Sequence, residues 1–289
     1  MHSVQLARVA GAPISWGVCE APDWGHEIAA DRVLSEMREL GLSATELGPT
    51  GYLGDDPDQV RERLARYAMR LIGGFLPVPM HVEDLDLDEA ERAIRTLAAA
   101  GSDVVVLAAR SIDGSYDRKV ALDDAEWTTL LDNLKRLQDL VRDNGMMPTL
   151  HPHVGTAIED RAAVLRLLES SDIALCLDTG HLVIGGTDPL ELVRSAAERI
   201  AHVHLKDVRL SVASSVRDTS YIDAVRRGLY TPLGDGDLDI AGMVDALESA
   251  GYNGWYVLEQ DAALPGEPAP GDGPVRDVAR SIAFLGADR

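Results

Sequence analysis

The chain has 289 residues, with 27 basic against 48 acidic side chains and a formal net charge of −21 at pH 7. Nucleic acids and anionic membranes are recognised mainly through Lys and Arg, so this charge argues against both as partners. The hydrophobic fraction of 46% is typical of an ordinary globular protein. The length permits either two domains or one larger one.

Cysteine usage and the N-terminal segment favour a reducing compartment. Cys19 and Cys176 each lie in an apolar, strand-like run, and we expect two buried free thiols. The first residues lack the basic and then apolar pattern of a signal peptide, and no apolar run approaches the ~18–20 residues of a membrane span. We therefore expect a cytoplasmic protein.

Eight short apolar runs alternate with stretches of helical periodicity. The strands are expected over 14–18, 44–47, 71–78, 104–108, 146–151, 173–178, 200–206 and 255–259. The helices are expected over 28–40, 57–69, 87–100, 121–143, 160–170, 188–199, 239–250 and 275–285. Glycines 41, 101, 145 and 251 mark four helix ends that lead directly into strands.

These strands are continuously apolar, as expected when both faces of a parallel sheet are buried. Eight β/α units predict an α/β fold with a single (β/α)8 TIM barrel domain over 1–289. The main competitor, a doubly wound sheet, would require a glycine-rich phosphate loop after an early strand, and the sequence lacks one. Two long segments, 207–237 and 262–274, follow late strands, where barrel enzymes elaborate the mouth of the active site.

Polar side chains that can bind a metal cluster at the predicted strand ends. Asp178, His204 and Glu259 end the last three strands, and they offer the oxygen and nitrogen donors that a divalent ion accepts. In a barrel the carboxyl ends of the strands converge, so we expect these three side chains to meet. In the run His-Val-His, His204 lies nearer the carboxyl end than His202, which we expect in the core.

Several motifs carry a resemblance to a known family. The stretches LCLDTGH, HVHLKD and GYNGWYVLEQD, with GDGDLD upstream, resemble the xylose-isomerase-like TIM barrel superfamily of sugar and sugar-phosphate isomerases and epimerases. The resemblance covers about 14–285. The stretches ISWG and HPHVGT are most similar to the inosose (2-keto-myo-inositol) dehydratase branch.

The resemblance implies one divalent ion (Mn, Co, Mg or Zn) held by Glu, Asp, His and Glu. Asp178, His204 and Glu259 match three of these ligands, but Thr149 stands where the first Glu is expected. Two side chains could replace it. We favour Glu159, since a second carboxylate restores the charge of the usual cage, over His151. The alternative for Glu159 is a carboxylate stabilised at a helix N-terminus.

The same resemblance implies enediolate chemistry on a keto-sugar or a cyclic polyol ketone. Isomerisation, epimerisation and dehydration all begin with removal of a proton next to a carbonyl, which a divalent ion would polarise. Glu159 and Glu259 are the expected acid–base pair. His151 is a further catalytic candidate, because an imidazole can protonate a departing hydroxyl, and this favours an inosose dehydratase.

Five side chains are candidates for binding the substrate. Three of them have a structural alternative: a buried core position for Trp16, an Arg partner for Glu46 and a rim ion pair for Lys206. The candidates are Trp16, Glu46, His153, His181 and Lys206.

Two other classes of function remain open. One is a phosphodiesterase like the abasic-site endonucleases of the endonuclease IV type, although the charge of −21 disfavours a DNA groove. The other is a non-catalytic sugar-binding barrel, which would have no need of a metal cage. We expect a small-molecule sugar or cyclitol as the partner, and a homo-oligomer is compatible with the sequence.

Overall fold

The computed structural model describes residues 4–286, so three residues at each end of the domain predicted over 1–289 lie outside the description. Eight parallel strands close into a barrel in the order β1-β10-β7-β6-β5-β4-β3-β2. The expected single TIM barrel is thereby confirmed. The strands are β1 (Val9–Gly11), β2 (Ala44–Glu46), β3 (Arg70–Val78), β4 (Val104–Ala109), β5 (Met147–Leu150), β6 (Ala174–Asp178), β7 (Ile200–Leu205) and β10 (Tyr256–Leu258).

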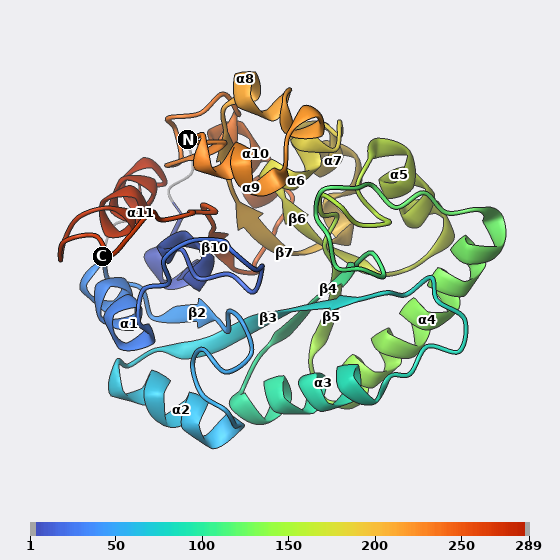
Figure 1. The fold of residues 1–289 in the computed structure, drawn as a ribbon, viewed down its shortest axis with the longest axis horizontal. Helices are drawn as coiled ribbons and strands as arrows, with labels where there is room; N and C mark the ends of the chain where they lie inside the picture. Colours follow the sequence, from blue (N-terminus) through green and yellow to red (C-terminus); the bar gives the residue numbers. More distant parts are fainter. Residues whose placement is uncertain (1–3, 287–289) are drawn as a thin grey trace.

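Helices form a ring around the strands (Figure 1). Gly41, Gly101, Gly145 and Gly251 all have φ between 78° and 90°, so the left-handed helix ends expected from the sequence are present. The helices are α1 (Ala30–Glu39), α2 (Pro57–Arg66), α3 (Asp88–Ala100), α4 (Asp124–Asp143), α5 (Arg161–Ser170), α6 (Thr179–Ile184), α7 (Pro189–Ala196), α8 (Leu210–Ala213), α9 (Tyr221–Arg226), α10 (Ile240–Ser249) and α11 (Pro274–Phe284). Within residues 4–286, none of them has both the length and the apolar character that crossing a bilayer requires.

The first strand differs from the sequence prediction. The strand expected over 14–18 is instead the short β1, and the 3₁₀ helix η2 (Pro13–Trp16) follows it. Pro13 explains the difference, because proline cannot donate to a strand ladder but fits the first position of a helical turn. Both cysteines are free thiols as expected, although Cys19 is only half-buried.

The segment 207–237 forms a roof over one side of the barrel mouth. It contains a two-stranded antiparallel ribbon of β8 (Asp207–Val208) and β9 (Tyr230–Thr231), with α8 and α9 between the two strands. The roof has an apolar cluster separate from the main barrel core. The buried members of this cluster are Trp24, Val154, Val208, Val216, Tyr221, Ala224, Val225, Leu229 and Tyr230.

One carboxylate joins the two ends of the roof, next to the end of β7. Asp207 follows β7 closely and is completely buried. Its two oxygens accept hydrogen bonds from the backbone N–H groups of Gly234 (2.8 Å), Gly236 (3.0 Å) and Leu238 (3.1 Å). The motifs LKD and GDGDLD are therefore two halves of one structural contact.

Candidate active site

Three predicted ligands converge at the carboxyl ends of neighbouring strands. Asp178 of β6 lies opposite His204 of β7, and Glu259 follows β10, which pairs with β7 on its other side. The His204 Nδ1 atom is 3.7 Å from Asp178 Oδ2 and 3.3 Å from Glu259 Oε2. The convergence expected from the sequence is present.

His151 completes this group from the end of β5. Its Nδ1 lies 2.8 Å from the carbonyl oxygen of Pro152, which can only accept, so Nδ1 is the donor in this contact. The Nε2 atom is 3.5 Å from Asp178 Oδ2. His151 thus directs Nε2 toward Asp178 and His204.

Glu159 is buried in the loop between β5 and α5, and its Oε2 accepts a hydrogen bond from the Gly155 N–H at 3.0 Å. Among the described residues, the sets of donor atoms close enough to share an ion include His151 with Asp178 and His204, and they do not include Glu159. The ligand role of Glu159 stays a prediction, and the geometry favours His151, the alternative that the sequence left open.

Glu46, expected at the substrate, lies beneath the ligands instead. Its Oε1 is 2.7 Å from His202 Nε2 and 3.0 Å from His204 Nε2. No Arg takes part in these contacts. Burial alone would raise the pKa of Glu46, but His204 and His202 hold it below its ordinary value. A carboxylate on the far nitrogen of a ligating histidine orients that ring, so Glu46 positions His204.

Burial by itself would lower the pKa of His204. The neighbouring Cys176, Glu259 and Glu46 instead raise this pKa well above the usual value for histidine. Without an ion His204 is therefore a cation among carboxylates, and a metal that binds Nδ1 must displace a proton.

Lys206 lies at the centre of the acidic groups. Its Nζ is 2.6 Å from Asp261 Oδ1, 3.1 Å from Glu259 Oε2 and 3.4 Å from Asp178 Oδ2, and it is 3.1 Å from His181 Nε2. Burial alone would lower the pKa of Lys206, but Asp178, Asp261 and Glu259 raise it well above the usual value. The alternative of a rim ion pair is thus wrong, because the ammonium is buried inside the site, and the substrate-binding role of Lys206 stays a prediction.

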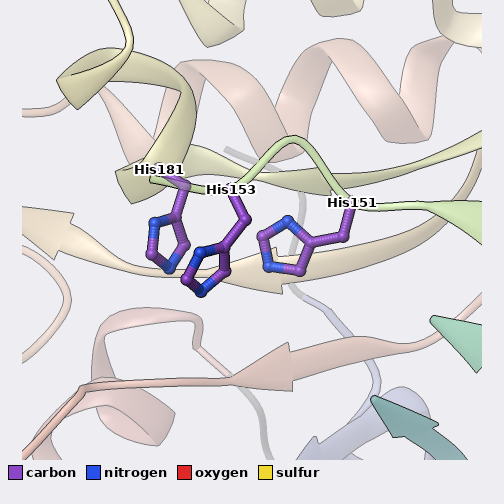
Figure 2. Close-up of side chains that lie close together, drawn as sticks. All are labelled: His151, His153 and His181. Atoms are coloured by element: carbon purple, nitrogen blue, oxygen red, sulfur yellow. The ribbon is translucent and has the colours of Figure 1, made fainter. Parts of the chain in front are cut away.

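Three imidazoles form one wall of the site. Figure 2 shows the rings of His151, His153 and His181, the first two on the segment after β5 and the third on α6. The rings of His153 and His181 are stacked with centroids 3.8 Å apart. Burial, the neighbouring imidazole in each case and the Lys206 ammonium hold the pKa of both rings well below 6.5. These two side chains are therefore neutral hydrogen-bonding groups at pH 7.

Trp16 takes the core position that the sequence left as an alternative. Its ring is fully buried in the main core, and its Nε1–H donates to Glu36 Oε2 of α1 at 2.8 Å. These contacts hold η2 against α1, and they give no support to a wall against substrate carbons.

The structure adds site residues that the sequence reasoning did not single out. Tyr221 Oη donates to Asp261 Oδ2 at 2.7 Å and is 2.8 Å from Tyr230 Oη. Asp261 was detectable, because it lies two positions after Glu259 and period-two alternation carries both to one side. Tyr221 and Tyr230 belong to the roof, where no alternation along a barrel strand predicts which way a side chain points.

The donor set fits a divalent ion. Asp178 Oδ2 and His204 Nδ1 are buried and lack a hydrogen-bond partner among the described residues. Within the set His151, Asp178 and His204, the separations of 3.5 and 3.7 Å from Asp178 Oδ2 to the two rings are close to the roughly 3.4 Å expected between ligands of a tetrahedral ion with bonds near 2.1 Å. Glu259 lies 3.3 Å from His204 Nδ1 but does not join that set of mutually close donors. Carboxylate and imidazole donors suit Zn, Mn or Co.

Comparison with known proteins assigns the class. A model of the xylose isomerase-like TIM barrel family matches residues 34–285, and the chain belongs to that family. Within it, the chain is similar to an inosose dehydratase of Geobacillus thermodenitrificans (strain NG80-2), at 35% identity over 282 residues, 91% of this chain and 93% of the relative. An inosose dehydratase of Lacticaseibacillus casei is 31% identical over 264 residues, 86% of this chain and 88% of the relative. The resemblance predicted from the motifs is confirmed.

Solved structures share the fold. The probable 3-DHS dehydratase AsbF of Bacillus anthracis superimposes with a TM-score of 0.71 at 14% identity, covering 98% of this chain and 100% of that one. The IOLI protein with a bound zinc atom also gives 0.71 at 14% identity, covering 96% and 97%. Together with the family assignment, the sequence relatives support a sugar-modifying TIM-barrel enzyme. Their names favour this class over the endonuclease and the non-catalytic barrel, the two alternatives that the sequence left open.

Proposed function

We propose that the protein is a divalent-metal-dependent dehydratase of an inosose such as 2-keto-myo-inositol. The single observation that carries the proposal is the close approach of donors from His151, Asp178 and His204, in which the buried Asp178 Oδ2 and His204 Nδ1 have no hydrogen-bond partner among the described residues. The names of the relatives that span about nine-tenths of the chain supply the substrate class.

The proposed ligands are His151, Asp178, His204 and Glu259. The two oxygens of Asp178 have different roles. Oδ1 accepts hydrogen bonds from the N–H groups of Gly180 and His181 at 2.8 Å and so caps α6, while Oδ2 faces the other donors. The zinc in the IOLI neighbour supports a metal in a barrel of this shape.

When bound, a divalent ion would supply Lewis-acid polarisation of the substrate carbonyl. Glu259 is then the carboxylate best situated to take the proton from the adjacent carbon. The Lys206 ammonium holds a proton beside His181 Nε2 and can deliver it to the departing hydroxyl. Net, one C–H bond and one C–O bond break, a C=C bond forms and water leaves.

The roof and the neutral histidines complete the proposed roles. The neutral rings of His153 and His181 accept or donate hydrogen bonds with ring hydroxyls without adding charge. The site side chains are less than a tenth exposed, so the roof excludes bulk water from a reactive enone.

The test follows product formation by apo protein reloaded with Mn²⁺ or Co²⁺. With 2-keto-myo-inositol we expect enone-type absorbance that disappears in Asp178→Ala and His204→Ala, both folded by circular dichroism and depleted of metal. A parallel reaction with ketohexoses is analysed for sugar composition. Epimerised sugars with no enone would replace the dehydratase proposal with an epimerase. Full activity in either metal-depleted variant would contradict the proposed metal site.

A further inference from the structure

The Lys206 ammonium lies on the same oxygen atoms that the proposed cage would offer to a metal. Nζ is 3.4 Å from Asp178 Oδ2 and 3.1 Å from Glu259 Oε2. These two oxygens are the ones that face His204 Nδ1, at 3.7 and 3.3 Å. An ion between these oxygens and His204 would therefore repel the ammonium at close range.

A second binding position for the Lys206 ammonium, at Asp261, lies beside the two cage oxygens. Asp261 Oδ1 is 2.6 Å from Nζ, closer than either cage oxygen, and Asp261 is buried. Tyr221 Oη donates to the other oxygen, Oδ2, at 2.7 Å and leaves Oδ1 directed at the lysine. The ring of Tyr230 also lies under the ammonium, with Nζ 5.2 Å from its centroid.

The charges around Lys206 do not balance. Asp178, Glu259 and Asp261 contribute three carboxylates around one ammonium, while Glu46 is engaged by His202 and His204. Buried charges are costly unless they are paired, so an apo site without the lysine would be strongly destabilised. With the lysine, the site still carries an excess of negative charge, which attracts a divalent ion.

We propose that Lys206 is an internal counter-ion that competes with the metal. In the metal-free site its ammonium pairs with the carboxylates of Asp178 and Glu259, and when the metal binds these carboxylates the ammonium pairs with Asp261 alone. Asp261 is then a positioning residue that keeps the ammonium off the cage. The inference rests on the proposed metal cage and adds to it an internal competitor that sets the affinity for the ion.

The test measures the affinity of chelator-stripped protein for Mn²⁺ alone, by calorimetry, with no substrate. Lys206→Met should bind Mn²⁺ roughly tenfold more tightly, because the competing charge is gone. Asp261→Asn should bind about tenfold more weakly, and Asp261→Glu should restore much of this loss. In the double variant the Asp261→Asn effect should vanish, because there is no ammonium left to restrain. Lys135→Met, which removes an exposed lysine paired with Asp139 on α4, is the matched control and should bind as the wild type does.

Thermal unfolding supplies an independent measurement. Lys206→Met should lower the melting temperature of the apo protein more than that of the Mn²⁺-saturated protein, and Lys206→Gln serves if the methionine variant does not fold. Equal or weaker Mn²⁺ binding in both Lys206 variants, or an undiminished Asp261→Asn effect in the double variant, overturns the inference while the wild type still binds. Absence of Mn²⁺ binding by the wild type overturns the proposed cage and the inference together.

Discussion

His151 and Glu159, both in the segment after β5, are the two candidates for the fourth ligand position. Their contacts favour His151. His151 Nε2 lies 3.5 Å from Asp178 Oδ2, whereas the Glu159 carboxylate accepts the Gly155 N–H. We expect His151→Ala to weaken Mn²⁺ binding by at least about tenfold and Glu159→Ala by less than about threefold. Metal titration of both purified variants measures the order. The opposite order would return the ligand role to Glu159, as the sequence pattern first suggested.

Glu46 provides a second prediction at this scale. Since its Oε1 holds the Nε2 side of His204, Glu46→Gln should weaken metal binding roughly 10–100-fold without removing a ligand. Glu36→Gln is the matched control, because Glu36 is also a buried carboxylate but bonds to Trp16 and Arg32 away from the site. Equal affinities in the two variants would show that Glu46 does not orient the histidine.

At the scale of elements, the sequence predicted most of the barrel because buried parallel strands have a distinctive composition. The run VVVLAA of β4 is completely buried, and the expected strand over 104–108 differs by one residue. The short helix α6 was missed, since its six residues are too few for a helical period. The start of α6 could have been predicted from Asp178, an N-cap residue, but the sequence analysis interpreted Asp178 only as a metal ligand.

The site was predictable only where strand ends determine direction. Asp178, His204 and Glu259 converge as expected, because barrel closure follows from eight strands. The positions of Tyr221 and Tyr230 depend on the roof, which strand periodicity does not report, and the contact of Glu46 with His204 depends on its side-chain rotamer.

The roof carries its own prediction. Removal of the Asp207 carboxylate leaves the N–H groups of Gly234, Gly236 and Leu238 without their acceptor. We expect Asp207→Ala to lower the free energy of unfolding by about 2–4 kcal/mol, as for the loss of charged, buried hydrogen bonds. Limited proteolysis should then cut within 207–237 first. Cleavage spread evenly along the chain would show that Asp207 does not anchor the roof.

For the whole molecule, buried histidines make stability depend on pH. The folded-state pKa values of His153, His181 and His202 are depressed, chiefly by burial, so below pH 6.5 the unfolded chain binds protons that the folded chain does not. Their contribution is present above about pH 6.5 and is lost as the pH falls. His204 behaves oppositely: its raised pKa makes its contribution complete below pH 6.5 and lost at higher pH.

The metal-free protein should therefore be less stable at pH 5.5 than at pH 6.5, by about 2–4 kcal/mol, since three histidines oppose one. Urea unfolding at the two pH values measures the difference. His153→Gln should reduce the slope, because it removes one of the three depressed imidazoles. A stability that rises on acidification would contradict the assignment of neutral rings.

The separate apolar cluster of the roof has a consequence for how such an enzyme can diversify. Tyr221, Val225 and Leu229 pack mainly within this cluster, whereas the barrel strands pack in the main core. Substitutions of these cluster residues can therefore change the roof without disturbing the strands that carry Asp178 and His204. For the proposed dehydratase, a directed-evolution library confined to this cluster can vary the cover of the site while the proposed ligands stay in place.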